Sequence, residues 1–371
     1  MRYRLLLIIS LTSLYAQAQD AYQFTSVIDL DATPVISQDR TGTCWSYSAS
    51  SFLESEIIRI KGKKIDLSEM YSVRNTYPIK AENYVMRQGK AQFSQGGLAH
   101  DVLNSVSQYG IVPQEAYSGL FVGETYHNHS EMEAVVKSML DTFIKNPGKS
   151  LSPKWKPAVE AVFDAYLGVR PTEFQFEGKN YTPQSFLEYT GIEPADYVSI
   201  TSFSHEPFYS SFILNIPDNF SNGSFLNVPL DDFIKILDHA LTKGYTVEFD
   251  CDVSESTFSS KHGVAFVPAN SEDKKKGLTE IVKEKEITQA YRQQEFENFN
   301  TTDDHLMHIT GTLKDKKGTK YYKVKNSWGT NENRVANGGY VYFSEAYMKL
   351  KTISITIHKD AMPKDIANHL K

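Results

Sequence analysis

The chain has 371 residues, of which 40% are apolar and 12% are aromatic, which is enough to build a sizeable core. Its formal net charge of −6 argues against a nucleic-acid partner, which would require a basic face. The length exceeds that of one ordinary domain, so we expect two lobes, or one lobe with large insertions.

The first eighteen residues, MRYRLLLIISLTSLYAQA, have the pattern of a cleaved secretory signal. A mostly apolar run from Leu5 to Leu14 follows two arginines, and Ala16 and Ala18 form an Ala-x-Ala end. We therefore expect residues 1–18 to be removed and the protein to be exported from a bacterial cytoplasm, into the periplasm or out of the cell. No later segment reaches eighteen unbroken apolar residues, so we expect no association with a membrane.

Residues 36–53, ISQDRTGTCWSYSASSFL, contain Cys44, one of only two cysteines in the chain. Apolar residues follow it at helical spacing, and Thr41 and Thr43 are typical of a helix start. We therefore expect Cys44 in the first turn of a helix, where the helix dipole favours the thiolate. In an exported protein the second cysteine, Cys251, could equally form a disulfide with it.

The remaining sequence separates into a helical part and a strand part. Helical spacing and helix-end signals predict helices over residues 97–109, 131–145, 154–167 and 230–241. Alternating patterns predict strands in YTVEFDCDV, HLMHITGTL, KYYKVKNSW, GGYVYF and TISITI. Helices followed by strands indicate an α+β protein with two lobes, a mainly helical lobe over residues 19–200 and a mainly β lobe over residues 201–371.

A nucleophilic thiol needs a base and a group that orients the base, and these are usually distant in sequence and close in space. The segment DDHLMHITG offers His305 and His308, and KNSWG offers Asn326. Gln38 precedes Cys44 by six residues, so that a loop could bring its amide back to the thiol. A lone histidine is far more often structural than catalytic. Together, however, Gln-x5-Cys-Trp, His and Asn-Ser-Trp-Gly in this order form a specific pattern.

This pattern resembles that of the papain-like cysteine peptidases. The further segments QGGLAHDVLNSVSQYGIVP and YTVEFDCDVSESTF are similar to those of the bleomycin hydrolase and aminopeptidase C branch. The resemblance implies a papain-like two-lobe α+β fold, with a helical lobe that carries the nucleophile helix and insertions, and an antiparallel β-barrel-like lobe. It also implies a thiol peptidase that acts on peptides without a cofactor or metal. The branch tends to form hexamers, so a homo-oligomer is implied as well.

In the family, the cysteine attacks the scissile carbonyl, the histidine carries the proton, and the asparagine orients the imidazole ring. The resemblance places these roles on Cys44, His305 and Asn326. Gln38 and the backbone N–H of Cys44 would form the oxyanion hole. The residues implied to contact the substrate or to shield the site from water are Gly96, Gly97 and Trp328.

The branch places its histidine first in His-x-Met, and this favours His305 over His308. Residues three apart on a strand point to opposite faces, so only one of the two can face the cleft. With Cys44 as the nucleophile, Cys251 becomes a core cysteine on a strand and not a bridge partner.

In the branch, a C-terminal arm lies in the cleft, and its carboxylate meets the free amino group of the substrate, which makes the enzyme an aminopeptidase. Here the last predicted strand, Thr352–Ile357, is followed by HKDAMPKDIANHLK, in which KDIANHL is typical of a helix. A helix advances only ~1.5 Å per residue, which shortens the reach of this segment. We therefore expect an open cleft that accepts N-blocked or longer peptides, as an endopeptidase would. The contrary hypothesis is that Lys371 reaches the cleft and aminopeptidase activity survives.

Three other interpretations are open. A catalytically silent papain-like protein that binds a peptide or a partner is disfavoured by the intact set of Cys44, His305, Asn326 and Gln38. A transglutaminase-like or amidase-like enzyme normally orients its histidine with an aspartate, and the Asn-Ser-Trp-Gly segment argues against it. A metal site formed by Cys44 and the two histidines lacks a tight ligand spacing.

Overall fold

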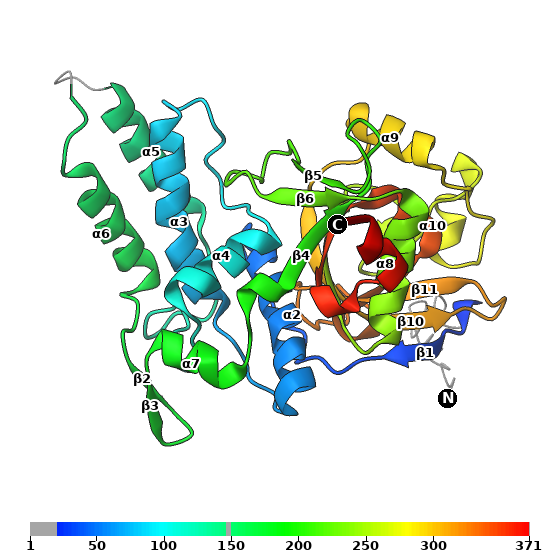
Figure 1. The fold of residues 1–371 in the computed structure, drawn as a ribbon, viewed down its shortest axis with the longest axis horizontal. Helices are drawn as coiled ribbons and strands as arrows, with labels where there is room; N and C mark the ends of the chain where they lie inside the picture. The colour runs from blue at the N-terminus through cyan, green and yellow to red at the C-terminus, as the bar shows by residue number, and fades with distance from the viewer. Residues whose placement is uncertain (1–20, 146–149, 371) are drawn as a thin grey trace, which may run out of the picture.

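The computed structural model describes residues 21–145 and 150–370, so the predicted secretory signal lies outside the described residues. The chain forms two lobes, with helix α2 (Cys44–Lys61) between them (Figure 1). Long helices stand side by side in one lobe, and a large sheet with helices around it forms the other. This arrangement confirms the predicted α+β class with a helical and a β-rich lobe.

The helical lobe contains the helices predicted before residue 200 and two further ones. Its elements are α3 (Glu69–Met86), α4 (Ala99–Tyr109), α5 (Ser130–Lys145), α6 (Trp155–Leu167), the hairpin of β2 (Phe174–Phe176) and β3 (Lys179–Tyr181), and α7 (Pro183–Thr190). Helix α3 was not predicted because it is buried on most sides, with polar residues among the buried ones, and shows no apolar stripe. It also holds a proline, Pro78, in its interior, which normally ends a helix.

Within the described residues, eleven strands form one sheet. They are β1 (Thr25–Asp29), β4 (Tyr197–Thr201), β5 (Ser210–Ile213), β6 (Ser224–Asn227), β7 (Val247–Cys251), β8 (Phe258–Ser259), β9 (Val264–Ala265), β10 (His305–Lys314), β11 (Lys320–Lys325), β12 (Tyr340–Ser344) and β13 (Thr352–His358). Their order is β5-β6-β4-β13-β7-β10-β11-β12-β9-β8, and β1 pairs with β10. The pairs β4–β6 and β9–β12 are parallel, so the sheet is less strictly antiparallel than predicted.

In the part of the chain that the structure describes, four α-helices belong to the β lobe and lie around this sheet (Figure 1). They are α8 (Leu230–Thr242), α9 (Gln289–Glu297), α10 (Glu345–Lys351) and α11 (Lys364–Ala367). Helix α8 agrees with the helix predicted over residues 230–241.

Helix α2 packs across β7 and β10 and so joins the two lobes. Ser48 of α2 donates to the backbone carbonyl of Met307 at 2.7 Å and to the carboxylate of Glu248 at 3.2 Å. Along β10 the side chains alternate, because Leu306 packs in the core of the helical lobe and Met307 in the core of the β lobe. The start of α2 is thereby held close to the start of β10.

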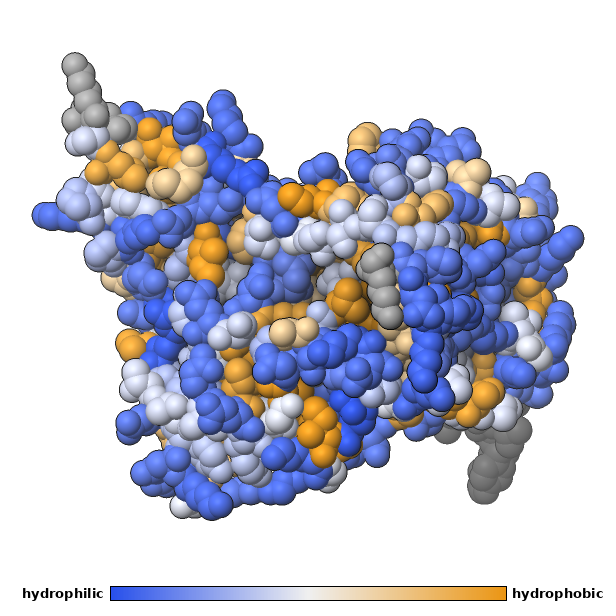
Figure 2. All heavy atoms as spheres, in the orientation of Figure 1, coloured by the Kyte–Doolittle hydropathy of each residue, from blue (hydrophilic) through white to orange (hydrophobic). Residues whose placement is uncertain are grey.

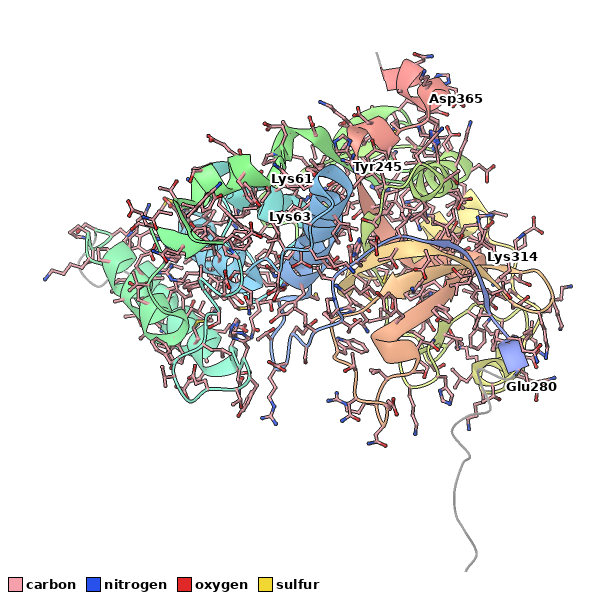
Figure 3. The ribbon with its side chains drawn as sticks, turned by 90° about the horizontal axis from the view of Figure 1, so that it is seen from below. Lys61, Lys63, Tyr245, Glu280, Lys314 and Asp365 are labelled. Atoms are coloured by element: carbon pink, nitrogen blue, oxygen red, sulfur yellow. The ribbon has the colours of Figure 1, made fainter. Side chains whose placement is uncertain are left out.

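The segment that follows β13 lies at the far end of α2 from Cys44. The guanidinium of Arg59 lies over the ring of Tyr245 at 4.3 Å, and His358 stacks on that ring with centroids 5.3 Å apart. Figure 3 shows Asp365 on the same side of the molecule as Tyr245. At ~1.5 Å per residue, Arg59 is about 22 Å along the helix from Cys44. The segment therefore begins at the opposite end of α2 from the thiol.

None of the described helices is long and apolar enough to cross a membrane. On the face shown in Figure 2, polar residues cover most of the surface and apolar residues are scattered among them. The outline of this face is indented between the two lobes.

Candidate active site

Cys44 is the first residue of α2, as predicted. Thr43 precedes it without capping the helix through its side chain, because its hydroxyl bonds to that of Thr41 at 2.6 Å. The first N–H groups of a helix have no acceptor within it, so they are available to other groups at this end. Cys44 is 8% exposed and Cys251 is fully buried, and both are free. The prediction that Cys251 is a core cysteine and not a bridge partner is confirmed.

The structure brings His305, Asn326 and Trp328 together at the rim of the sheet. His305 begins β10, and Asn326 directly follows the neighbouring strand β11. The Nε2 atom of His305 lies 2.8 Å from Oδ1 of Asn326. Because an amide oxygen can only accept, this bond keeps the proton on Nε2 and leaves the lone pair on Nδ1. The ring of Trp328 lies against the imidazole, with centroids 4.9 Å apart.

The thiol lies beside the start of β10, since Ser48, one turn further along α2, donates to the backbone carbonyl of Met307 at 2.7 Å and the backbone of Leu306 acts to lower the pKa of Cys44. Burial, together with nearby carboxylates, raises the pKa of Cys44 to about 12. Burial also lowers the pKa of His305 to about 4, although the bond to Asn326 acts the other way. Burial therefore acts against the thiolate that the start of a helix favours.

Gln38 is held beside the site by the residue that follows Asn326. Its backbone N–H donates to the carbonyl of Ser327 at 2.9 Å, and its side-chain oxygen accepts from the Ser327 hydroxyl at 2.6 Å. Its amide nitrogen donates to the carbonyl of Thr41 at 2.7 Å. An amide nitrogen carries two N–H groups, so a second one remains to meet an oxyanion.

Gly96 and Gly97 lie between α3 and α4, on the helical side of the site. A Cβ atom on Gly97 would lie 3.1 Å from the ring of Trp45, and one on Gly96 would collide with the carboxylate of Asp218. The carbonyl of Gly96 accepts a hydrogen bond from the ammonium of Lys80. Both positions therefore need the absence of a side chain for close packing.

His308, the alternative histidine, contacts a different part of α2. It is fully buried, and its Nδ1 lies 2.9 Å from the hydroxyl of Ser51, two helical turns beyond Cys44. Burial lowers its pKa well below the usual value. The geometry therefore supports His305 over His308 as the histidine that serves the thiol.

Three carboxylates near the thiol were missed by the sequence analysis. Asp218, Asp250 and Asp303 all raise the pKa of Cys44. Two of them carry a signal in the sequence, because Asp303 belongs to the Asp-Asp pair directly before His305, and Asp250 is a charged residue inside a strand that is buried throughout. Asp218 lies in the loop between β5 and β6 and carries no such signal.

Another group of carboxylates in the described residues, Glu54, Asp66 and Glu69, is close enough to share a metal ion. The ammonium of Lys325 acts on Glu54 and Asp66 and lowers their pKa values, against the burial that raises them. Lys325 donates to the hydroxyl of Thr33 at 2.9 Å, and that hydroxyl donates to Glu54. The charge of this group is therefore offset only in part by a lysine of the chain itself, and Glu54 also accepts from the backbone N–H of Leu67 at 2.8 Å.

Comparison with known proteins places this geometry in a family. A sequence profile described as the Peptidase C1-like family matches residues 8–371. The chain is 25% identical to Aminopeptidase C of Lactococcus lactis subsp. lactis (strain IL1403) over 382 residues, with 91% of this chain and 83% of that protein covered. It is 22% identical to Cysteine proteinase 1, mitochondrial, of Saccharomyces cerevisiae (strain YJM789) over 405 residues, with 95% and 80% covered.

The fold also matches a solved structure. A crystal structure of PepW from Lactobacillus rhamnosis HN001 superposes with a TM-score of 0.74 at 21% identity. The match covers 93% of this chain and 84% of that chain. At this level of identity the likeness shows the fold.

Proposed function

The chain belongs to the Peptidase C1-like family and is a cysteine peptidase with the predicted papain-like fold. On that premise, we propose that it hydrolyses peptide bonds through a triad of Cys44, His305 and Asn326 and a thioester intermediate. The contact of 2.8 Å between His305 and Asn326 carries the proposal, because it fixes the imidazole ring with Nδ1 free to act as a base. The bond from Ser48 to the carbonyl of Met307 supports it, because it holds the start of α2, and with it Cys44, close to the start of β10.

In the proposed reaction, Nδ1 of His305 takes the proton of the Cys44 thiol as the sulfur attacks the scissile carbonyl carbon. The oxyanion that forms is stabilised by the amide of Gln38 and the backbone N–H of Cys44. The imidazolium gives its proton to the leaving amine, the C–N bond breaks, and a thioester remains. His305 then deprotonates a water molecule, which attacks the thioester and releases the acid and the thiol. Both groups begin and end neutral, in keeping with the burial that disfavours a resting ion pair.

The triad is tested by incubating the protein with short peptides and identifying the products by mass spectrometry. Cys44→Ala is expected to abolish hydrolysis, whereas Cys251→Ala, a matched change at the other free cysteine, retains it. Asn326→Ala should reduce the rate less than His305→Ala, because the base is kept. A protein that cleaves no peptide would instead be the catalytically silent relative, and hydrolysis that survives His305→Ala but not His308→Ala would contradict the choice of histidine.

We also propose that residues 358–370 leave the cleft open on its amino side. This segment begins at the far end of α2, and Ile366 within it is 1% exposed and packs in the core of the β lobe. The name of the relatives, Aminopeptidase C, favours the contrary hypothesis of a demand for a free amino group. The rates for a dipeptide amide and its acetylated twin are compared in the full chain and after deletion of residues 368–371, which keeps Ile366. We expect the acetylated twin to be cleaved, and the ratio of the two rates to be the same in the full and the shortened chain. If the full chain requires the free amine and the deletion abolishes this requirement, the proposal is contradicted.

Export is proposed from the composition of residues 1–18 alone. The family profile begins at residue 8, inside this segment. N-terminal sequencing of protein recovered from the periplasm or the medium of a bacterial host should begin near Gln19. Recovery in the cytoplasm with an intact N-terminus would contradict the proposal.

A further inference from the structure

Three carboxylates from three separate segments meet beside the thiol. Asp218 comes from the β5–β6 loop, Asp250 from β7 and Asp303 from the residues before β10. The backbone N–H of Asp218 donates to Oδ2 of Asp303 at 3.1 Å, and the carboxyl groups of Asp303 and Asp250 are within hydrogen-bond reach of each other. Asp250 pairs in the sheet with Leu306, which directly follows His305, and it is one of the carboxylates that raise the pKa of Cys44. These three residues, called the acidic cluster below, therefore lie at the thiol.

Asp250 is the member of the cluster that most needs a partner. Its side chain is 1% exposed, and neither of its carboxylate oxygens accepts a hydrogen bond from a donor in the described residues. Leaving a buried polar group without a partner costs about 1–3 kcal/mol, and more for a charged one. Two carboxyl groups in contact can be joined only by a shared proton or by a cation. Burial and the neighbouring carboxylates raise the pKa of Asp303 to about 7 and that of Asp250 well above its usual value. The pair therefore binds a proton readily, and a cation could bind in place of that proton.

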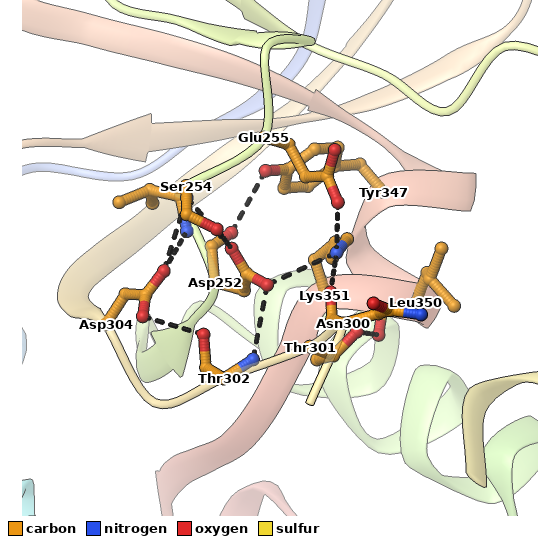
Figure 4. A network of polar contacts seen from close by, with 11 residues as sticks. Asp252, Ser254, Glu255, Asn300, Thr301, Thr302, Asp304, Tyr347, Leu350 and Lys351 are labelled. Carbon is orange, nitrogen blue, oxygen red and sulfur yellow. Dashed lines mark hydrogen bonds and ion pairs between the residues drawn. The ribbon is translucent and has the colours of Figure 1, made fainter. Parts of the chain in front are cut away.

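The next acidic pair along the same segments is fully supplied with donors (Figure 4). Asp252 accepts from the backbone N–H groups of Ser254 and Thr302, at 2.8 and 3.2 Å, and pairs with Lys351 at 3.2 Å. Asp304 accepts from the hydroxyl of Thr302 at 2.8 Å and from the N–H of Ser254 at 3.2 Å. The chain thus completes this pair with its own groups, and the contrast shows that the acidic cluster is not a general property of the region.

Lys80 is the cation that acts on the acidic cluster, and it is engaged elsewhere. Its ammonium donates to the carbonyl of Gly96 and lies 4.9 Å from the centre of the Phe220 ring. It lowers the pKa of Asp218, but burial and Asp101 act in the opposite direction and the net pKa is raised. Because the ammonium of Lys80 is bound to the carbonyl of Gly96, Asp250 and Asp303 are left to be joined by a shared proton.

The β5–β6 loop brings the cluster to the path that a substrate would take. The loop extends from the β lobe toward the helical lobe (Figure 1) and is fixed there. Ser221 donates to Asp101 at 2.6 Å, and Asn222 accepts from Arg87 at 3.1 Å. Asp218 of this loop lies against Gly96, which the resemblance to the papain-like peptidases implies is in contact with the substrate. A peptide that passes this glycine on its way to the thiol therefore meets the acidic cluster.

We propose that the acidic cluster binds a cationic group of the peptide substrate on the amino side of the scissile bond. The proposal rests on the proposed peptidase function and adds a substrate class, peptides with a positive charge within the two residues before the cleaved bond. A free α-amino group and a lysine or arginine side chain present the same chemistry, a positive charge with N–H donors. Either would take the place of the shared proton and donate to the oxygens of Asp250 and Asp303.

The test measures kcat/KM for matched fluorogenic peptide amides that differ by one charge. Leu-Leu and acetyl-Leu-Leu amides differ in the α-amino group. Acetyl-Lys-Leu and acetyl-norleucyl-Leu amides differ in the charge of one side chain. Acetyl-Leu-Lys and acetyl-Leu-norleucine amides make the same comparison at the residue next to the cleaved bond. The protein is used as the full chain, unsubstituted and with Asp218→Asn or Asp303→Asn. Asp304→Asn is the matched control, because it removes one charge next to the cluster from a residue that has its own donors. Thermal melting shows which variants are folded.

In at least one substrate pair, the unsubstituted protein should prefer the cationic member by about 10- to 100-fold, the range of a charge-assisted hydrogen bond. The preference should fall toward one with Asp218→Asn and with Asp303→Asn, but not with Asp304→Asn. The pair that responds identifies the α-amino group or the side chain as the source. Equal rates within all pairs, or a preference that both substitutions leave unchanged, would overturn the cation site alone. The absence of any cleavage would overturn the proposed function and the cation site with it.

Discussion

Two groups of carboxylates lie beside α2, and they differ in the hydrogen-bond donors that the chain supplies to their buried members. Beside the middle of the helix, Glu54, Asp66 and Glu69 lie around Lys325, which donates to the hydroxyl of Thr33. At the start of the helix, the acidic cluster has a lysine that is bound to a backbone carbonyl instead. The difference shows that buried acid alone does not mark a binding site. In the first group Glu54 accepts from the backbone N–H of Leu67 and from the hydroxyl of Thr33, whereas in the second no donor of the described residues reaches the carboxylate of Asp250.

Removing Lys325, the lysine of the first group, should have the largest effect on stability. Lys325→Met leaves Glu54 and Glu69 buried without their cation, and we expect the free energy of unfolding to fall by about 3–5 kcal/mol. Urea denaturation measures the change. Lys323→Met on the same strand is the control, because Lys323 pairs with the exposed Asp29 and such pairs contribute less than about 1 kcal/mol. Equal effects of the two substitutions would contradict the structural role of the first group.

Removing a charge from the acidic cluster should have the opposite effect and stabilise the protein. The pKa of Asp250 is raised in the folded state, so the folded protein binds its proton more tightly and loses stability as pH rises above the usual carboxyl range. Asp250→Asn should therefore raise the melting temperature, and more at pH 8 than at pH 5. Asp252→Asn should lower it, because the buried Lys351 loses a partner. A lower melting temperature of Asp250→Asn at pH 8 would show that the cluster is structural.

Charge recognition by the acidic cluster should depend on pH. Asp303, which faces Asp218, Asp250 and Asp304, has its pKa raised to about 7, so it gains its charge as pH rises from 5.5 to 7.5. The preference for the cationic substrate should increase over this window, in which amino groups stay largely protonated. The rate for the neutral substrate should stay flat, because the pKa of His305 is lowered to about 4. A preference that is constant over the window would contradict the role of Asp303.

A smaller effect is expected from the glycine that touches the cluster. Gly96→Ala places a Cβ atom against the carboxylate of Asp218, so this carboxylate must move and the charge preference should fall several-fold. Gly97→Ala meets the ring of Trp45 instead and should change the preference less. The ratio of kcat/KM within the responding substrate pair measures both. Equal losses in the two variants would show that the glycines act through the general shape of the cleft.

Much of the fold could be predicted because most elements carry the period of their own structure. The helix that begins at Cys44 repeats its apolar residues at helical spacing, although all of its residues from Cys44 to Ile57 are buried, and the strands around His305 alternate between two cores. Helix α3 was not predicted, because it is buried on most sides and its sequence therefore lacks the amphipathic pattern. The motif residues Cys44, His305, Asn326 and Gln38 could be named because their order along the chain is specific.

The ionisation of the site could not be predicted from local sequence. A helix start suggests a thiolate, but the pKa of Cys44 depends on how deeply the folded lobes bury it. The acidic cluster was missed for a related reason. Asp250 and Asp303 are brought together by the pairing of β7 with β10, whereas Asp218 comes from the β5–β6 loop, which reaches Asp303 from another part of the sheet. A strand register cannot be read from the period of each strand alone.

The most direct test of the account is to trap the acyl-enzyme. The protein is mixed with a rapidly acylating peptide ester, quenched in acid, digested and mapped by mass spectrometry. The account predicts that the acyl mass of the substrate appears on the peptide that contains Cys44, and that it is lost with Cys44→Ala. An acyl group on Cys251, or hydrolysis that continues with no adduct and survives Cys44→Ala, would contradict the central claim that this thiol is the nucleophile.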